Sequence, residues 1–292
     1  MHHHKNATHH NLRLAFFLNL GFTLAEVVGG LYTNSVAILS DAVHDLGDSI
    51  SLGMAWYLEN LSQRDRDQRF SYGYRRFSLL GALLTTSILI IGSIIILIEA
   101  IPRLVTPERA NASGMAVFAL IGITVNGLAV LRLRKDETLN ARAAAWHLFE
   151  DVLGWIGVLV VSIVLLFRPI YILDAILSIV ITLYISWNVI ANLRKTLTLF
   201  LQGVPETINI EEIDNFLRSI PEVKSTHHTH VWSLDGEHHV LTTHVVVDEG
   251  LSKDAILCVR SDLQGLLSTL EFSHSTIEIE FGDGDCGMAA AG

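Results

Sequence analysis

The sequence predicts an α-helical membrane protein with six transmembrane helices, followed by a smaller cytoplasmic α+β domain. Half of the 292 residues are hydrophobic and only 17% are charged, which is too apolar for an ordinary soluble domain. Four uncharged runs are near the length needed to cross about 30 Å of hydrocarbon. The charge then changes abruptly, from a net +2 over residues 1–204 to a net −12 over residues 205–292.

The four clearest spans contain no charged residue and cover residues 77–98, 114–131, 152–167 and 175–193. Residues 12–58 are long enough for two more spans, with a break at residues 32–35. The second of these spans carries Asp41, Asp45 and Asp48, and a membrane helix tolerates such acids when they face the interior of a helix bundle. No cleavable signal peptide is apparent, and we expect six spans.

The distribution of basic residues predicts the orientation. With the N-terminus in the cytoplasm, thirteen Lys/Arg fall in inner segments, against Arg103, Arg109 and Arg168 outside. Both termini are therefore expected in the cytoplasm, in a multi-pass protein of a bacterial inner (cell) membrane. We expect three parts: a His-rich N-terminal tail (1–11), a transmembrane domain (12–204) and a cytoplasmic domain (205–292). The tail histidines hold metal loosely or are a remnant of an expression tag.

Two short stretches place a histidine and an aspartate four residues apart, His44 with Asp48 and His147 with Asp151. Residues four apart share one helix face, so each stretch offers an imidazole beside a carboxylate. If the two helices begin near residues 36 and 139, the pairs lie at one depth and can meet. Two nitrogens and two oxygens make a plausible tetrahedral set, so the sequence predicts a Zn²⁺ site within the membrane.

The alternative is that these residues are structural. An isolated membrane histidine is most often a hydrogen-bonded contact between helices. Two pairs favour a metal site, because four buried ionisable groups without a ligand are hard to stabilise. Asp41 is a candidate for a route to the outer side. Asp45 lies about 100° around the helix from His44, and Glu150 about 100° from Asp151, so both are candidates for salt bridges or proton relays.

Residues 205–292 form an acidic module, which should repel nucleic acid and attract cations. Its hydrophobic periodicity predicts helix, strand, strand, helix and strand, in that order. The predicted ranges are 210–220, 225–234, 240–248, 252–270 and 276–281. A module of about 80 residues is marginal alone, so we expect it to dimerise.

Seven histidines lie in this module. Strand alternation predicts that His228 and His230 face one side and His227 the other, and His238 and His239 are expected in a solvated hairpin turn. Cys258 occupies an apolar helix position and is expected in the core. Exposed histidines on an acidic surface, without metal, remain an open alternative.

Several runs together resemble the cation diffusion facilitator family in its zinc-transporter branch. They are Glu26 to Gly30, Ser40-Asp41-Ala42 before His44-x-x-x-Asp48, Tyr72 to Arg76, His147-x-x-x-Asp151, His227 to Leu234 and Thr243 to Val247. The resemblance implies a homodimeric, proton-coupled zinc exporter with a transport site at His44, Asp48, His147 and Asp151. It also implies a ferredoxin-like, metallochaperone-like cytoplasmic domain.

The same resemblance implies cytoplasmic zinc ligands at His227 and His244, joined by His274 or Glu280, with Cys286 as a further candidate. Zinc would then be both the transported substrate and a regulatory ligand, with protons and membrane lipid as the other partners. Phe77 departs from the family pattern, because an acid often follows the Gly-Tyr-x-Arg run.

Two other function classes also hold zinc in or near a membrane. An intramembrane metalloenzyme is disfavoured, since the chain has no His-Glu-x-x-His run and no evident water-activating carboxylate beyond the ligands, so we expect no enzyme activity. A zinc-gated channel or sensor without uphill transport stays open. Imidazole binds zinc when neutral and carboxylate when ionised, so protonation expels the metal and an inward proton gradient can drive zinc outward.

Overall fold

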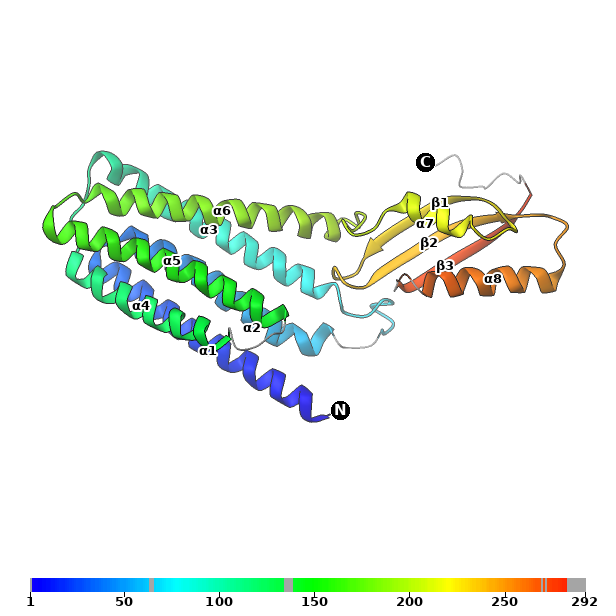
Figure 1. The fold of residues 1–292 in the computed structure, drawn as a ribbon, viewed down its shortest axis with the longest axis horizontal. Helices are drawn as coiled ribbons and strands as arrows, with labels where there is room; N and C mark the ends of the chain where they lie inside the picture. Colours follow the sequence, from blue (N-terminus) through cyan, green and yellow to red (C-terminus); the bar gives the residue numbers. More distant parts are fainter. Residues whose placement is uncertain (1, 63–65, 134–138, 269, 271, 283–292) are drawn as a thin grey trace. The chain divides into compact units, whose positions relative to one another are not determined.

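The computed structural model describes residues 2–62, 66–133, 139–268, 270 and 272–282 (Figure 1). The chain divides into two compact units. The first unit holds residues 1–59 with 81–193, and the second holds residues 60–80 with 194–292. The loop before the third long helix and the last turns of the sixth therefore group with the C-terminal module.

Six long helices come first in the chain. They are α1 (His2–Thr33), α2 (Val36–Ser62), α3 (Phe77–Val105), α4 (Ala112–Leu133), α5 (Leu139–Phe167) and α6 (Ile172–Phe200). The break between α1 and α2 falls at Asn34, whose φ of 54° ends the first helix, and at Ser35. This confirms the predicted break at residues 32–35 and the extension of the fifth helix back to residue 139.

Among the described residues, five helices are long and apolar enough to cross a membrane: α1, α3, α4, α5 and α6. Large apolar side chains on them are half or more exposed, including Ile95, Leu128 and Val160, as expected for surfaces that contact lipid. The chain is therefore a multi-pass membrane protein. The remaining helix, α2, carries three aspartates, yet its residues Ala37 and Ile38 are fully buried.

A polar seam joins α2 to α6. Asp174 caps the start of α2: its carboxylate accepts from Ser35 Oγ at 2.5 Å and from the backbone N–H of Val36 at 2.8 Å. The seam continues one turn later, where Ser178 Oγ donates to the Val36 carbonyl at 3.2 Å. Asp174 is 3% exposed, so charge-assisted bonds in a dry environment hold the helix that carries half of the predicted site.

The second unit contains α7 (Ile210–Leu217), β1 (Val223–Ser233), β2 (His239–Val247), α8 (Lys253–Ser268) and β3 (Phe272–Phe281), in the predicted order. The sheet order is β1-β2-β3, with β1 antiparallel and β3 parallel to β2. Asn209 caps α7, because its side-chain oxygen accepts a hydrogen bond from the backbone N–H of Glu211. The helix therefore begins at the next residue, Ile210.

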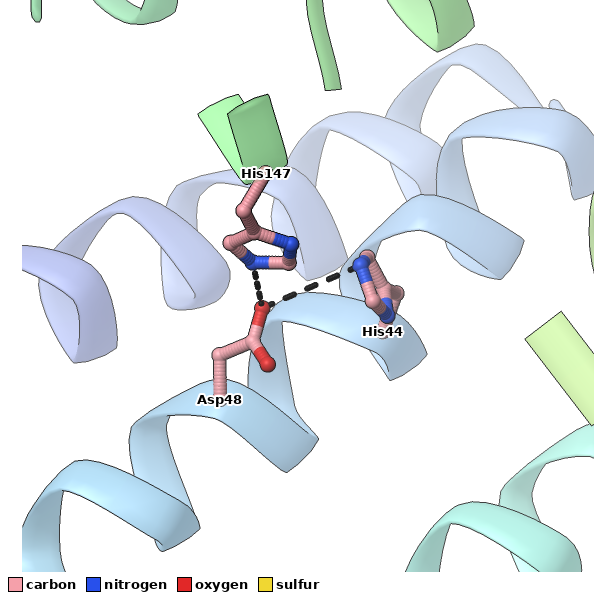
Figure 2. Close-up of side chains that lie close together, drawn as sticks. All are labelled: His44, Asp48 and His147. Atoms are coloured by element: carbon pink, nitrogen blue, oxygen red, sulfur yellow. Dashed lines mark hydrogen bonds and ion pairs between the residues drawn. The ribbon is translucent and has the colours of Figure 1, made fainter. Parts of the chain in front are cut away.

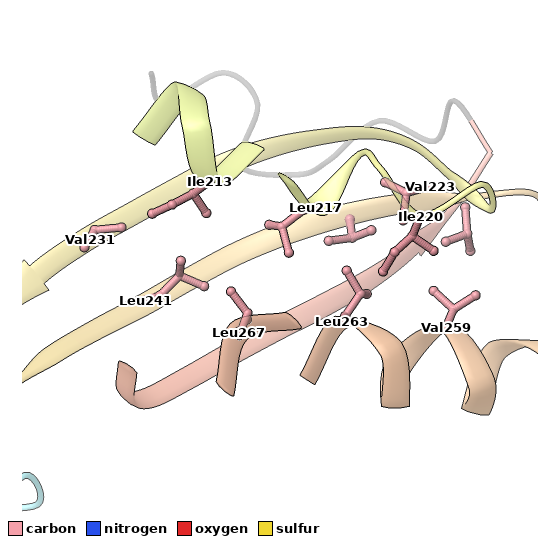
Figure 3. Packing of buried hydrophobic residues seen from close by; sticks show 11 residues of the cluster. Ile213, Leu217, Ile220, Val223, Val231, Leu241, Val259, Leu263 and Leu267 are labelled. Atoms are coloured by element: carbon pink, nitrogen blue, oxygen red, sulfur yellow. The ribbon is translucent and has the colours of Figure 1, made fainter. Parts of the chain in front are cut away.

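One hydrophobic core holds the module together (Figure 3). It joins Ile213 and Leu217 of α7 and Val259, Leu263 and Leu267 of α8 to alternate residues of the strands. Both helices therefore cover the same face of the sheet. The other residues of each strand are left for the opposite face, which carries the polar side chains described below.

Two expectations about this module were wrong. Cys258 is exposed, because α8 buries the stripe of Val259, Leu263 and Leu267, and position 258 lies one step around the helix from it. The hairpin histidines are half-buried rather than solvated. His238 Nδ1 lies 2.7 Å from Asp235, and burial lowers the pKa of His239 below its ordinary value.

Candidate metal centres

The two His/Asp pairs of the membrane region meet. His147 Nε2 of α5 lies 2.8 Å from Asp48 Oδ2 of α2, and His44 Nε2 lies 3.8 Å from the same oxygen (Figure 2). One ligand atom from each of these three residues lies within 4.8 Å of the others. Asp151 is not among these three residues, but its Oδ1 lies 3.7 Å from His44 Nε2. We call His44, Asp48, His147 and Asp151 the membrane quartet.

Three separations within the membrane quartet are compatible with a tetrahedral ion. Ligand atoms about 2.0 Å from zinc stand about 3.3 Å apart at the corners of a tetrahedron. The observed separations of 2.8, 3.7 and 3.8 Å lie on either side of that value. Asp151 contacts His44 but lies outside the group of ligand atoms within 4.8 Å of one another, so its carboxylate would have to move to complete a tetrahedron. The two imidazoles and two carboxylates are donor types that Zn²⁺ accepts.

The quartet is only partly buried. The side chains of His44 and His147 are 24% and 40% exposed, whereas that of Asp151 is 9% exposed. The quartet therefore has a more exposed side at the two histidines and a covered side at Asp151.

More acids lie deep around the quartet. Asp41 and Asp45 are 5% and 6% exposed, and Glu26 of α1, at 1%, lies beside Asp45. Gly154 of α5 packs beside these acids, since a Cβ on it would stand in ordinary contact with Asp41 Oδ1, at 3.6 Å. Glu150 faces elsewhere and accepts from the Tyr184 hydroxyl at 3.0 Å.

Sequence reasoning did not identify the roles of Glu26 and Asp174. Each is a lone acid in an apolar stretch, and an acid in such a position is the sequence signal that could have marked it as buried and functional. Asp174 caps a helix rather than facing the quartet, and only the packing of α6 against α2 reveals this. Glu26 reaches the acids of α2 from another helix, a contact that no spacing within one helix predicts.

A second group of possible ligands lies on the sheet. His244 Nδ1 is 2.7 Å from Glu280 Oε1, and His227 Nε2 is 3.1 Å from Glu280 Oε2. One ligand atom from each of these residues lies within 4.8 Å of the others. We call His227, His244 and Glu280 the cytoplasmic trio. Glu278 stands at its edge, 3.4 Å from His244 Nε2, with a side chain that is 60% exposed.

His227 and His244 of the trio are direct partners across β1 and β2, and a β-bulge follows His227. The pairing of β1 with β2 shifts between His227 and His230, and His228 there has a φ of 48°. The bulge breaks strand alternation and brings the His228 ring 5.6 Å from that of His227 and 5.4 Å from that of His244. The expectation that His227 faces away from His228 was therefore wrong.

The remaining predicted ligands are not in the trio. His274 pairs with Val240, four residues from His244 along β2, and its ring packs 5.3 Å from that of Tyr72. The structure thus brings Glu280, and not His274, to the two histidines. Cys286 and the side chains of the N-terminal histidines lie outside the described residues.

Comparison with known proteins matches two consecutive parts of the chain to two family domains. Residues 12–201 match the cation efflux transmembrane domain, and residues 205–281 match the cytoplasmic domain of cation efflux proteins. Together these matches cover nearly all of the sequence.

Individual relatives are similar over almost their full length. The zinc transporter ZitB of Escherichia coli (strain K12) is 34% identical over 275 residues, which cover 92% of this chain and 87% of the relative. The metal cation efflux system protein CzcD of Cupriavidus metallidurans is 31% identical over 282 residues, covering 96% and 89%. A cadmium, cobalt and zinc/H(+)-K(+) antiporter of Bacillus subtilis (strain 168) is 29% identical over 282 residues, covering 95% and 91%.

Proposed function

Because this chain belongs to the cation efflux (cation diffusion facilitator) family, we propose that it exports Zn²⁺ from the cytoplasm in exchange for protons through the membrane quartet. The observation that carries the proposal is the meeting of His44 and Asp48 on α2 with His147 and Asp151 on α5. Relatives named as zinc transporters and as an antiporter support the substrate and the exchange.

The chemistry of the donors links zinc to protons. Zinc requires neutral imidazole and ionised carboxylate, so the ion and protons compete for the same four side chains. Protons entering from the acidic side would displace zinc from the quartet, and loss of those protons to the cytoplasm would restore it. Exposure of the quartet to one side at a time then couples the two flows.

The proposal includes the architecture that this exchange needs. We take α2 as the sixth span, with its aspartates facing the bundle, and we assign both termini to the cytoplasm from the distribution of basic residues. We assign residues 1–11, 12–204 and 205–292 to the N-terminal tail, the membrane domain and the cytoplasmic domain. The protein works as a homodimer, as expected from the match to the cytoplasmic domain of this family.

The cytoplasmic trio acts as a zinc sensor in this proposal. Zinc at His227, His244 and Glu280 would reduce the repulsion between two acidic modules and draw them together. That contact would bias the membrane helices toward transport. His274 and Cys286 remain candidates for completing the coordination.

Transport into sealed vesicles tests the proposal. Full-length protein is reconstituted with a zinc indicator inside, and an acidic interior is imposed. An exporter of this kind accumulates zinc against its gradient and stops when a protonophore collapses the pH difference. A zinc-gated channel would only equilibrate zinc, and a sensor would move none.

The quartet is tested in the same vesicles with Asp48→Ala and Asp151→Ala. Each removes one ligand, so we expect uptake to fall by about 100-fold or more, because even outer-shell partners of a metal are worth about 10–100-fold. Glu108→Gln is the control, since Glu108 is an exposed acid outside the quartet that pairs with Arg103. Uptake by either alanine variant equal to that of the control would remove the quartet as the transport site.

A further inference from the structure

A small cavity in the second unit has no role in the proposed zinc cycle. Its volume is about 280 Å³, close to the about 300 Å³ at which small-molecule sites begin. One wall is the loop over residues 69–77, and the opposite wall includes Gln202, Trp232 and Leu234. All of these residues belong to the same compact unit.

Three arginines line this cavity: Arg69, Arg75 and Arg76. The Nε and Nη2 atoms of Arg76 are buried and have no hydrogen-bond partner among the described residues. Among the described residues, the acid that pairs with Arg75, whose side chain is 42% exposed, is Asp235 at 3.8 Å, and the Asp235 carboxylate also lies 2.7 Å from His238 Nδ1. Buried guanidinium donors without a partner are costly, and the described residues supply none for Nε and Nη2 of Arg76, so the cavity suits an added anion.

The loop that carries the arginines is held in shape. Asp67 Oδ1 accepts from the backbone N–H of Arg69 and Phe70, and Asp67 Oδ2 accepts from the Tyr74 hydroxyl at 2.6 Å. The hydrogen bond from the Tyr74 hydroxyl lowers the pKa of Asp67, which favours the ionised form of the carboxylate that holds this loop together. The Tyr72 ring packs 6.3 Å from that of Trp232 across the cavity. The arginines are therefore presented by an ordered wall.

The cavity also has an apolar rim next to membrane-spanning helices. Phe70 and Tyr72 are 38% and 44% exposed, although both are large aromatic side chains. Phe77 is the first residue of α3, and Gln202 follows the last residue of α6 by two positions. Aromatic side chains gather at the level of lipid headgroups, and basic pockets at helix ends bind anionic headgroups.

We propose that this cavity binds a phosphate group, and that the phosphate belongs to the headgroup of an anionic phospholipid. The planar forks of the arginines match phosphate oxygens two at a time. Phe70, Tyr72 and Trp232 would contact the glycerol and the start of the acyl chains. A lipid held there would tie the loop before α3 to the membrane surface.

Native mass spectrometry of the full-length, delipidated protein in uncharged detergent tests this proposal. The probes are short-chain phosphatidylglycerol, short-chain phosphatidylcholine and inorganic phosphate. We expect saturable binding of one phosphatidylglycerol per protomer, with phosphatidylcholine at least about tenfold weaker. Equal affinity for the two lipids overturns the proposal. Inorganic phosphate that binds as tightly as phosphatidylglycerol would assign the cavity to free phosphate and overturn the lipid source.

Arg76→Gln should weaken phosphatidylglycerol binding about tenfold or more, and Arg76→Lys should lose less, because it keeps the charge without the fork. Arg109→Gln is the control, an exposed arginine between α3 and α4. Unchanged binding by Arg76→Gln refutes the site. If that variant does not fold, as judged by gel filtration and circular dichroism, the Arg69→Gln/Arg75→Gln variant replaces it, and unchanged binding there has the same meaning.

Discussion

The membrane quartet and the cytoplasmic trio use the same side-chain types on different backbones. The quartet places two residues on each of two helices, and the three close separations between its ligand atoms range from 2.8 to 3.8 Å. The trio takes one residue from each of three hydrogen-bonded strands, and Glu280 lies 2.7 and 3.1 Å from the two histidines. Helix packing can rearrange without breaking backbone hydrogen bonds, whereas a strand ladder cannot.

This difference is consistent with the two roles proposed above. Ligands on two helices can separate, as loading and release of an ion require. Ligands on a sheet are held in place, as the proposed sensor requires. Three changes, in order of decreasing expected effect, test whether helix packing governs the quartet and sheet pairing governs the trio.

The largest effect is expected at the seam that holds α2. Asp174→Ala removes the acceptor for Ser35 Oγ and for the first N–H groups of α2, and it leaves those donors buried. We expect a loss of about 2–3 kcal/mol of stability, together with reduced zinc transport. Thermal unfolding in detergent, followed by circular dichroism, and vesicle uptake measure the two effects.

The matched control for this seam is Ser178→Ala, which removes one neutral hydrogen bond to the Val36 carbonyl. Its cost should be about 1 kcal/mol. If both variants unfold at the same temperature, Asp174 does not anchor α2 in the way described, and the quartet must be positioned by other contacts.

A smaller effect is expected at Glu280. Glu280→Gln keeps the shape of the side chain but removes the charge between His227 and His244. Zinc affinity of the trio should fall about tenfold, measured by calorimetry on full-length protein that also carries Asp48→Ala and Asp151→Ala. Glu278→Gln, at the exposed edge, should change affinity much less. Equal losses in the two variants would mean that Glu280 has no bridging role.

The smallest effect is expected in the pH dependence of the stability of the cytoplasmic module. Burial lowers the pKa of His239 in the folded state, so the unfolded chain binds its proton more readily. Stability is therefore lost as pH falls from the ordinary value of 6.5 through the lowered one. His239→Gln should reduce the drop in unfolding temperature between about pH 7.5 and 5.5 in the presence of EDTA. His230→Gln, at an exposed position, should leave that drop as it is in the unsubstituted protein.

Local patterns predicted much of this molecule. The break at residues 32–35, the start of the fifth helix at residue 139 and the strand and helix order of the module were correct. These features depend on runs, periods and spacings within about one element. Membrane helices are especially predictable, because the hydrocarbon requires each span to satisfy its own backbone hydrogen bonds.

Features that join distant residues were harder to predict. The bulge at His228 breaks the expected alternation of the β1 histidines. The ring of His274 packs against that of Tyr72, which lies in a loop about two hundred residues earlier. The exposure of Cys258 followed from which stripe of α8 faces the sheet. Each of these outcomes depends on the partner that packs against the element.

The sequence by itself determined the helices, the module and the two His/Asp pairs, because hydrophobic period and the i, i+4 spacing are properties of single elements. Only the tertiary structure decided that α6 clamps α2 through Asp174 and that Glu280 rather than His274 joins the sheet histidines. It also decided that Arg76 faces a cavity with unpaired donors. Contacts of this kind are set by packing between elements, and no spacing along one element encodes them.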